Sequence, residues 1–327
     1  MIVLGIESSC DETSAAILEN GSIRASEIYS QKDHAAFGGV VPEIASRAHL
    51  EKIDPLCRAV FSHAGIAPSG LDLVAVTDSP GLAGALLVGV SFALGLHASY
   101  GTPLTGVNHL EGHICSALIE HPELGFPFLA LVVSGGHTAI YRVDDIGRYD
   151  RICRTVDDAA GEAFDKVGKL LGFAYPAGRS VEETASLAPR PNPLSFPVAR
   201  LRDGSLDFSF SGLKTAVKYY AGTLSASQVR EQRPRICDAF QSAVVQSLAG
   251  HSRRAMELTG IRRMVLVGGV ACNKALRGAL AGVFGAGLFF PSPQLCTDNA
   301  AMIARAGFEK VKRAQGRFPR MSPVQEF

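Results

Sequence analysis

One pattern, an apolar strand followed by a polar turn and a returning strand, occurs twice in this chain and constrains its fold most. The first copy has apolar runs at residues 2–6 and 14–18, and the second has them at 128–133 and 138–143, about 126 residues later. Short apolar runs bounded by polar or glycine-containing turns are typical of strands. Their recurrence in the same order indicates an internal duplication.

A second pair of segments matches in the same order. Residues 71–76 and 264–267 are apolar runs that each lead into a glycine-containing turn and then a helical pattern, at an offset of about 191. This offset exceeds the first by about 65 residues, so we expect an insertion in the second half. The segment 173–235 fits because it is irregular and contains several prolines: Pro176, Pro189, Pro191, Pro193, Pro197 and Pro234.

Size and composition agree with two α/β lobes. The chain has 327 residues, of which 47% are hydrophobic and 19% charged, which excludes disordered and fibrous classes. Helical patterns occupy residues 41–64, 165–171, 236–258, 273–283 and 299 to about 317. In the first of these, we expect one apolar face made of Ile44, Leu50, Ile53, Leu56, Val60 and Phe61. We predict two lobes, each built on a mixed sheet, with a nucleotide cleft between them.

The compartment is predicted to be a reducing cytoplasm. The seven cysteines are far apart with no C-x-x-C pair, and the first residues show no secretory signal. No residue from Ser79 to Leu110 carries a formal charge, so this stretch is long enough to span a bilayer. It contains Pro80 and Pro103, however, and we expect a buried helix packed through small residues, with no membrane contact.

Two histidines form the first candidate site. His109 and His113 are spaced i, i+4, so on a helix both can bind one metal ion. Glu111 lies about 200° around the helix from His109 and points away from that face, which argues against a metalloprotease. The alternative is a pair of histidines with no ligand. A third ligand must come from elsewhere, and Asp298 is a candidate, although it is equally suited to cap the last helix.

Glycine turns and nearby polar residues form the second candidate site. Gly135 and Gly136 follow one predicted strand, as Gly268 and Gly269 follow another, and their backbone N–H groups can approach phosphate oxygens. Neither turn fits a Walker or dinucleotide motif. Further along, Asp165 could accept ribose hydroxyls and Asn273 could contact a purine edge, or simply cap a helix.

Six ordered motifs resemble the TsaD/YgjD family over essentially the whole chain. They are ESSCDET at 7–13, NHLEGH at 108–113, VSGGHT at 133–138, FSFSGLKT at 208–215, GGVACN at 268–273 and CTDNA at 296–300. The resemblance implies a duplicated actin-like, sugar-kinase-like (ASKHA) fold, in agreement with the duplication. We expect an N-terminal lobe at 1–107, onto which a helix at 300–327 packs back, and a second lobe at 108–299 with its insertion around 173–235.

The resemblance also implies an activity, tRNA N6-adenosine threonylcarbamoyltransferase. In this family the threonylcarbamoyl group passes from threonylcarbamoyl-adenylate to N6 of the adenosine beside the anticodon, in tRNAs that read codons beginning with A. The implied cofactor is one divalent ion, Fe²⁺ or Zn²⁺, and the implied partners of the bacterial branch are a TsaB-like paralogue, forming a heterodimer, and a TsaE-like ATPase. Two other functions fit similar motifs: an O-carbamoyltransferase acting on a small molecule, and an actin-like nucleotide-binding scaffold.

Carried over position by position, the family's site residues fall on named positions here. The metal ligands are His109, His113 and Asp298. The adenylate contacts are Val132, Val133, Ser134, Gly135, Gly136, Asp165, Gly178, Glu182 and Asn273. Asp11 and Glu12 match a phosphate-side loop, and Asp11 is our candidate general base. The chain departs from the family pattern at Ala177 and Arg179, beside the adenylate loop.

Charge is unevenly distributed. The net charge is only +1, yet residues 1–78 hold 5 Lys/Arg against 11 Asp/Glu, so the remainder is basic. A cluster of basic residues ends the chain, and in it we name Lys312, Arg313 and Arg317 as candidates for tRNA contact. A solvated helix end would explain the same cluster.

Overall fold

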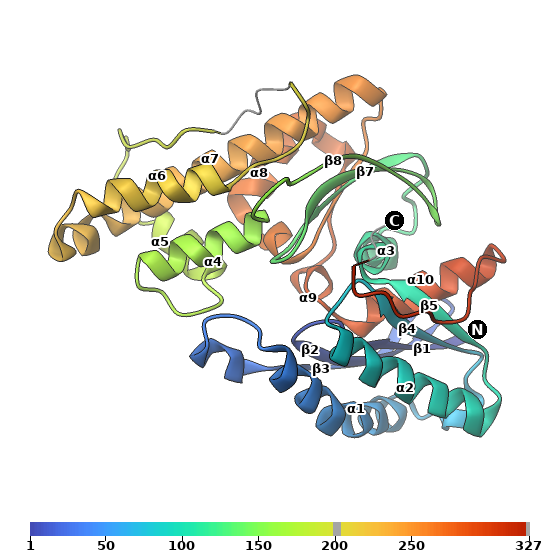
Figure 1. Ribbon diagram of the computed structural model, residues 1–327. Helices are drawn as coiled ribbons and strands as arrows, with labels where there is room; N and C mark the ends of the chain where they lie inside the picture. The colour runs from blue at the N-terminus through green and yellow to red at the C-terminus, as the bar shows by residue number, and fades with distance from the viewer. Residues whose placement is uncertain (199–203, 325–327) are drawn as a thin grey trace. The chain divides into compact units, whose positions relative to one another are not determined.

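The computed structural model describes residues 1–198 and 204–324, which form two compact units, each with its own five-stranded mixed sheet (Figure 1). Unit 1 comprises Met1–Phe126, Asp144–Tyr149 and Pro291–Phe327. Unit 2 comprises Pro127–Val143 and Asp150–Phe290. The short segment 144–149 is the turn of a strand hairpin that otherwise belongs to unit 2.

The sheet of unit 1 has the strand order β3-β2-β1-β4-β5. Its strands are β1 (Ile2–Glu7), β2 (Glu12–Glu19), β3 (Ser22–Ser30), β4 (Leu73–Ser79) and β5 (Leu104–Asn108). The central strand β1 pairs antiparallel with β2 and parallel with β4, and β4 pairs parallel with β5. The carboxyl ends of β1, β4 and β5 therefore meet at one edge of the sheet.

The sheet of unit 2 repeats this arrangement, with the order β10-β9-β6-β7-β8. Its strands are β6 (Phe128–Val133), β7 (Thr138–Asp145), β8 (Arg148–Arg154), β9 (Met264–Val267) and β10 (Leu288–Phe289). Here β6 takes the place of β1, because it pairs antiparallel with β7 and parallel with β9. The predicted duplication is confirmed, since both pairs of matched segments occupy equivalent strands.

Helices cover both faces of the unit 1 sheet: α1 (Pro42–Ala64) and α2 (Ala83–Tyr100) lie on one face, and α10 (Ala300–Lys312) lies on the other. Side chains alternate along β1, so Leu4 and Ile6 join the core under α1 and α2, while Gly5 faces α10. A Cβ at Gly5 would overlap Ala304 of α10. Glycine at this position therefore lets the last helix lie close against the sheet.

Two expectations about helix burial are wrong. Leu50, placed on the apolar face of α1, is 69% exposed. The stretch around α2 does not form a buried helix. One face of α2 packs on α1 and β4, and Leu87 on the other face is 51% exposed. By length and composition α2 is the single helix among the described residues that could cross a membrane, and 28% of it is buried.

Unit 2 contains helices α4 (Ala160–Leu170), α5 (Gly178–Ala185), α6 (Ser211–Gly222), α7 (Ala226–Thr259) and α8 (Lys274–Phe284). The Pro-rich segment lies between β8 and β9, as an insertion does in a duplicated fold, and supplies α5, α6 and the start of α7. Helix α7 begins ten residues before the expected start at 236, because Ser225 caps it and Pro234 is accommodated inside.

The division into units differs from the lobe boundaries expected at 107 and 299. Helix α3 (His109–Glu120) groups with unit 1, because it packs on α10. Residues 291–299, including the short helix α9 (Pro293–Cys296), also group with unit 1. Every residue of the predicted metal group therefore lies in one unit. The last helix ends at Lys312, before the expected Arg317.

Candidate active site

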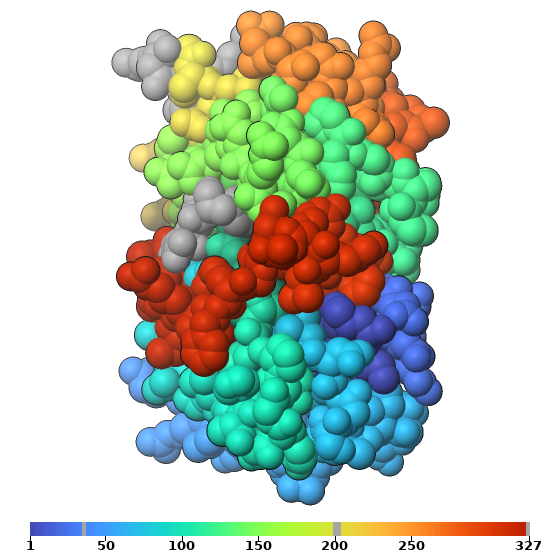
Figure 2. All heavy atoms as spheres, turned by 90° about the vertical axis from the view of Figure 1, so that its right-hand side faces the viewer, coloured from blue at the N-terminus to red at the C-terminus, as the bar shows by residue number. Residues whose placement is uncertain are grey.

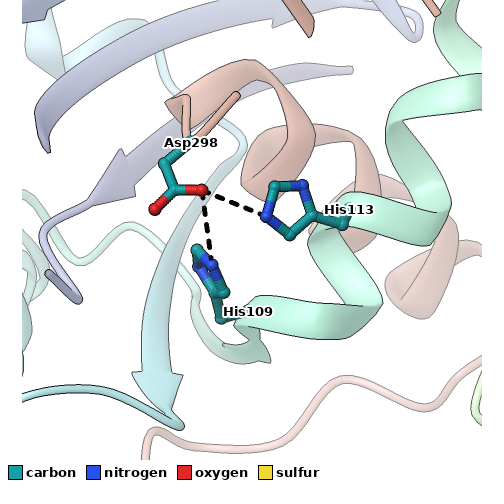
Figure 3. A group of neighbouring side chains, drawn as sticks. All are labelled: His109, His113 and Asp298. Carbon is teal, nitrogen blue, oxygen red and sulfur yellow. Dashed lines mark ion pairs between the residues drawn. The ribbon is translucent and has the colours of Figure 1, made fainter. Parts of the chain in front are cut away.

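The predicted metal ligands lie at the carboxyl edge of the unit 1 sheet. Asn108 ends β5, and its side chain accepts hydrogen bonds from the backbone N–H groups of Leu110 and Glu111, so helix α3 begins immediately at His109. His109 and His113 then lie one turn apart on the same side of α3 (Figure 3). Their ring centroids are 4.7 Å apart.

Asp298 comes from the loop before α10 and faces both histidines (Figure 3). Its Oδ1 lies 3.1 Å from Nε2 of His113 and 3.6 Å from Nε2 of His109. The capping role that Asp298 was equally suited to is filled by Asn299, whose side chain accepts the N–H of Met302 at 2.9 Å. The structure therefore brings together the three residues that the family resemblance implied as metal ligands.

This group has the composition of a metal site. One ligand atom from each of His109, His113 and Asp298 can be chosen so that all lie within 4.8 Å of one another. His113 is fully buried, and within residues 1–198 and 204–324 neither of its ring nitrogens makes a hydrogen bond, although Nε2 has the ion-pair contact with Asp298 at 3.1 Å. A buried imidazole without hydrogen bonds is costly unless a ligand is bound. Two imidazoles and one carboxylate fit Zn²⁺ or Fe²⁺ and leave coordination positions for a substrate.

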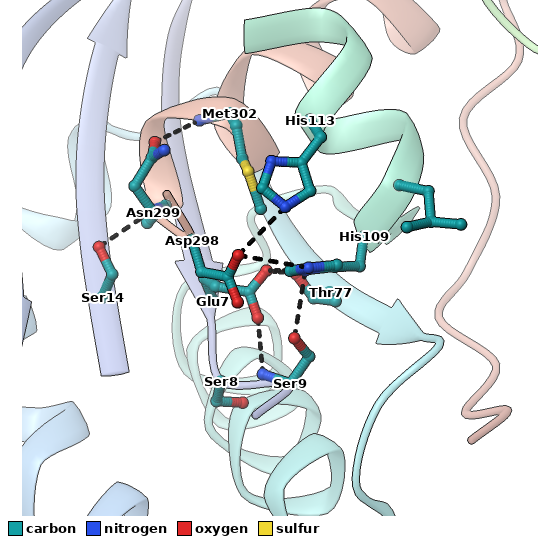
Figure 4. Close-up of polar contacts among 12 residues, drawn as sticks. Glu7, Ser8, Ser9, Ser14, Thr77, His109, His113, Asp298, Asn299 and Met302 are labelled. Atoms are coloured by element: carbon teal, nitrogen blue, oxygen red, sulfur yellow. Dashed lines mark hydrogen bonds and ion pairs between the residues drawn. The ribbon is translucent and has the colours of Figure 1, made fainter. Parts of the chain in front are cut away.

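Glu7, which the sequence analysis did not single out, supports His109 from behind (Figure 4). Its Oε2 lies 3.0 Å from Nδ1 of His109 and accepts the hydroxyl of Thr77 at 2.7 Å, while its Oε1 accepts the N–H of Ser9 at 2.6 Å. A carboxylate on Nδ1 leaves Nε2 as the nitrogen presented to a metal. Two signals in the sequence pointed to Glu7: it ends a buried strand, and it is the first residue of the ESSCDET motif.

The charges of this pair depend on each other. Burial raises the pKa of Glu7, but the charge and hydrogen bond of His109 outweigh burial, and the pKa lies below its usual value. Burial likewise lowers the pKa of His109, but Asp298 and Glu7 outweigh it and raise the pKa to about 9. The positive charge of His109 is thus stabilised by two carboxylates, Glu7 and Asp298, which repel each other.

Asp11 and Glu12 also belong to unit 1, at the turn between β1 and β2. Burial, and then the charges of Asp298 and Asp11, raise the pKa of Glu12 to about 10. Glu12 is therefore a neutral carboxyl at neutral pH. Burial raises the pKa of the neighbouring Cys10 thiol, which argues against a thiolate nucleophile there.

Glu111 points away from the metal group, as predicted. Its Oε1 accepts the hydroxyl of Tyr149 at 2.8 Å, and its Oε2 accepts Nζ of Lys310 at 2.7 Å. Both Glu111 and Lys310 are buried. This carboxylate joins α3 to α10 and is not placed to act on a metal-bound water, which excludes the metalloprotease arrangement.

The two glycine turns of unit 2 lie side by side at the carboxyl ends of the parallel neighbours β6 and β9. Gly268 has φ +94°, and a Cβ there would overlap the backbone of Val133, so only glycine fits. In the other turn, Ser134 and His137 bond to each other. A Cβ at Gly135 or Gly136 would meet open space, so a ligand can approach this backbone.

The remaining predicted adenylate contacts form one connected set in unit 2. Asp165 of α4 accepts the N–H of Ala177 at 2.7 Å, directly before α5 begins at Gly178. Glu182 of α5 accepts the N–H of Lys274 at 2.7 Å, at the start of α8. Ala177 has φ −98°, so the departure from the family pattern there causes no backbone strain.

Asn273 caps helix α8, which is the alternative role that the sequence suggested for it. Its Oδ1 accepts the N–H of Leu276 at 2.9 Å and caps α8, and its Nδ2 donates to Gln241 at 2.8 Å. Its amide is thus held by two protein partners, and the side chain is buried.

The basic residues at the end of the chain are largely engaged within unit 1. Arg317 donates two hydrogen bonds, at 2.6 and 2.9 Å, to the buried carboxylate of Asp78. Arg313 forms ion pairs with Glu309 and Asp145. Lys312 is exposed and is the one of the three with no ion pair among the described residues. Figure 2 shows this C-terminal segment (red) along the surface of unit 1, above α2.

Solved structures with similar folds are distant in sequence. The HypF protein of T. kodakarensis superposes with a TM-score of 0.64 at 14% identity, covering 96% of this chain and 47% of that one. The activator of the 2-hydroxyisocaproyl-CoA dehydratase from Clostridium difficile, with bound ADPNP, gives a TM-score of 0.55 at 17% identity, covering 96% and 97%. These likenesses show the fold, which is of the actin-like, sugar-kinase-like type that was predicted.

Sequence relatives are much more similar. The family model for tRNA N6-adenosine threonylcarbamoyltransferase, TsaD, matches residues 22–305. Proteins of that name from Geobacter sp. (strain M21) and Geobacter sulfurreducens are 49% and 50% identical over 312 and 317 residues, which is 94% of this chain and 90% and 91% of theirs. The chain therefore belongs to the TsaD family of tRNA N6-adenosine threonylcarbamoyltransferases.

Proposed function

We propose that this protein transfers the threonylcarbamoyl group from threonylcarbamoyl-adenylate to N6 of the adenosine next to the anticodon, in tRNAs that read codons beginning with A. The observation that carries the proposal is the buried His109, His113 and Asp298 group, found in a chain that matches TsaD proteins over 94% of its length. The group suits a substrate-binding metal because two imidazoles and one carboxylate leave coordination positions open.

His109, His113 and Asp298 would hold one Fe²⁺ or Zn²⁺. When bound, a divalent ion supplies a Lewis acid that neutralises negative charge on oxygen atoms of the donor. Glu7 accepts the Nδ1–H of His109 and so keeps Nε2 available as a ligand. Thr77 and the backbone of Ser9 fix Glu7 in turn.

The adenylate contacts belong to unit 2. The N–H groups of Gly135 and Gly136 are suited to receive phosphate oxygens, because no hydrogen bond among the described residues occupies them and no side chain blocks them. Val132 and Val133 are the buried strand residues that hold this turn. Asp165 would offer its carboxylate to the ribose.

Gly178, Glu182 and Asn273 are proposed to shape the adenylate site through the backbone. Gly178 begins α5, and a side chain there would point into open space where a ligand can lie. Glu182 and Asn273 both bond to the first turn of α8 and fix where that helix begins. Substitution of Glu182 or Asn273 is expected to lower the affinity for the adenylate and to have a smaller effect on the rate of the transfer step.

In the transfer step, a bond forms between N6 of the adenosine and the carbamoyl carbon. The bond from that carbon to the phosphate oxygen breaks, AMP leaves with the electron pair, and N6 loses one proton. Asp11 is proposed as the group that accepts this proton. Glu12, neutral at pH 7 because its pKa is raised, would donate a hydrogen bond beside it.

A TsaB-like paralogue and a TsaE-like ATPase are the proposed protein partners, and the proposed compartment is the cytoplasm. The exposed apolar side chains of Leu87 and Leu94 on α2 support a protein partner, since exposed apolar surface is favourably covered on association. Leu87→Glu with Leu94→Glu should prevent a heterodimer from forming in size-exclusion chromatography.

The test is nucleoside mass spectrometry of tRNA incubated with the protein, threonylcarbamoyl-adenylate and both partners. We expect threonylcarbamoyl-adenosine with the native protein and none with His113→Ala or Asp298→Ala at unchanged melting temperature. His121→Ala is the matched control, because this histidine directly follows α3 and lies outside the metal group. Absence of the product with the native protein would overturn the proposal.

The same assay separates the two alternatives. An O-carbamoyltransferase would consume carbamoyl-adenylate with a small hydroxylated acceptor and leave the tRNA unmodified. A nucleotide-binding scaffold would bind the adenylate and release no AMP when tRNA is added.

A further inference from the structure

A groove in unit 2 lies outside all the residues assigned above. It is a hollow of about 270 Å³ between α4 and α6, which lie side by side in Figure 1. Its lining residues are spaced i, i+4 along the two helices, so each pair shares a face: Lys166 and Leu170, Lys214 and Lys218, Thr215 and Tyr219. Lys214 and Thr215 belong to the FSFSGLKT motif, which the proposed chemistry does not use.

Three lysines give this groove an excess of positive charge. Asp158 accepts Nζ of Lys166 at 2.7 Å and Nζ of Lys214 at 3.2 Å, and Glu162 pairs with Lys166 at 2.8 Å. These contacts hold two ammonium groups, one from α4 and one from α6, at the same carboxylate. Lys218 is exposed and makes no ion pair among the residues the structure describes, so its charge is available to a ligand.

An aromatic ring lies beside these charges. Tyr219 is 75% exposed and Leu170 is also exposed, so both present apolar surface to solvent. Ammonium groups next to an exposed aromatic ring match single-stranded or looped RNA, in which phosphates alternate with bases that stack on such rings. An acidic peptide could pair its carboxylates with the lysines, but it has no bases to stack on the tyrosine ring.

The groove is also held in shape before any ligand binds. Asp157 accepts hydrogen bonds from the hydroxyl of Ser209 at 2.6 Å, the N–H of Phe210 at 2.8 Å and the hydroxyl of Ser211 at 2.8 Å. These contacts join the start of α6 to the loop before α4. Preformed spacing between charged groups lowers the cost of binding a ligand.

We propose that the groove between α4 and α6 binds the phosphodiester backbone of the substrate tRNA, with Lys214 and Lys218 contacting phosphates and Tyr219 stacking on a base or ribose. This inference rests on the proposed function, because tRNA is the polyanion that the reaction brings to the protein. The groove residues position the RNA and take no part in the transfer step.

The test uses the protein with its partners and compares Lys218→Glu and Tyr219→Ala with the native chain. Both side chains are exposed and make no hydrogen bond with the described residues, so folding should be unaffected. We expect the KM for tRNA to rise about tenfold, with kcat and the KM for adenylate unchanged. For Lys218→Glu, the slope of log Kd for tRNA against log salt should fall by about 1, as for one lost phosphate contact.

Arg253→Glu is the matched control, because this arginine is exposed on α7 of the same unit and does not line the groove. It should leave the KM for tRNA within twofold of the native value. If the native protein transfers the threonylcarbamoyl group and the groove variants keep the native KM and salt slope, the inference is wrong while the proposed function stands. If the groove variants lose binding to the ATPase partner and keep the native affinity for tRNA, the inference is also wrong, and the groove binds an acidic surface of that partner. If the native protein produces no threonylcarbamoyl-adenosine, the proposed function itself fails.

Discussion

Glu7 and His109 form a buried pair in which Oε2 of the carboxylate lies 3.0 Å from Nδ1 of the imidazole, on the side away from Asp298. Glu7 is the last residue of β1, and His109 directly follows β5. Both strands pair in parallel with β4, which lies between them, so their carboxyl ends lie close together. Because the carboxylate accepts a hydrogen bond from the Nδ1–H group, it favours the tautomer that leaves Nε2 unprotonated toward a metal.

Glu7→Gln is therefore expected to weaken metal binding about 10–100-fold, the usual effect of removing such a supporting carboxylate. The amide is a poorer acceptor, and it no longer stabilises the Nδ1–H form of His109. Zn²⁺ titration against a chromophoric chelator measures the affinity directly. Thr77→Val is the control, since it removes one hydrogen bond to Glu7 but keeps the carboxylate, and its effect should be smaller. Native affinity in Glu7→Gln would show that His109 needs no such support.

The strands could be predicted from the sequence because each is a short apolar run bounded by turns, and the duplication followed from their order. Local sequence patterns predicted the metal group only in part, and Asp298 was joined to it by the family resemblance. His109 and His113 are neighbours on one helix, but Asp298 lies about 185 residues further on, and no local pattern brings it back. Only the packing of α3 on α10 does so.

Charge alone does not tell whether a side chain faces solvent or a protein partner. Arg317 stays a candidate for tRNA contact, and no local pattern shows that it pairs with Asp78, which lies far away in sequence at the end of β4. Glu7 was overlooked for the same reason. Helix α2 was expected to be buried because it is apolar throughout, and apolarity does not show which face is left uncovered.

The ion pair between Glu111 and Lys310 joins α3 to α10 and thus holds the histidines opposite Asp298. Lys310→Met leaves a buried carboxylate without its cation, which should lower the free energy of unfolding by about 3–5 kcal/mol. Lys312→Met, exposed on the same helix, should change it by less than about 0.5 kcal/mol.

Urea unfolding followed by circular dichroism compares these variants. The double variant Glu111→Gln, Lys310→Met should recover part of the loss, because no unpaired charge then remains buried. A loss no greater in Lys310→Met than in Lys312→Met would show that the pair contributes nothing to stability.

The C-terminal segment after α10 is held to the unit 1 sheet by Arg317. Its guanidinium bonds twice to buried Asp78, and its backbone bonds to Thr105 and Gly106 of β5. Arg317→Gln should leave Asp78 buried without its cation and release the segment. Hydrogen exchange of residues 316–323 is then expected to accelerate at least tenfold.

Arg320→Gln is the matched control for this segment, because Arg320 contacts Asp78 through its backbone N–H and its side chain is exposed. That variant should exchange at the native rate. Equal protection in Arg317→Gln and Arg320→Gln would mean that the side chain of Arg317 does not hold the segment.

Asp157 links the start of α6 to the loop before α4, and this link gives a dependence on pH. Burial raises its pKa, but hydrogen bonds from Ser209, Phe210 and Ser211 outweigh burial, and the pKa lies below the usual 3.8. A carboxylate whose pKa is lowered by folding stabilises the folded state above pH 3.8, and this contribution is lost as the pH falls through the folded pKa.

Asp157→Ala should therefore lower the free energy of unfolding by about 1–2 kcal/mol at pH 7, the range for losing a helix cap with a charged acceptor. The difference from the native protein should shrink as the pH falls below 3.8. Urea unfolding at pH 7, 5 and 3 measures it, with Asp150→Ala on β8 as a control for a partly exposed carboxylate. A difference that stays constant down to pH 3 would show that the hydrogen bonds to Asp157 do not depend on its charge, since protonation would then leave them intact.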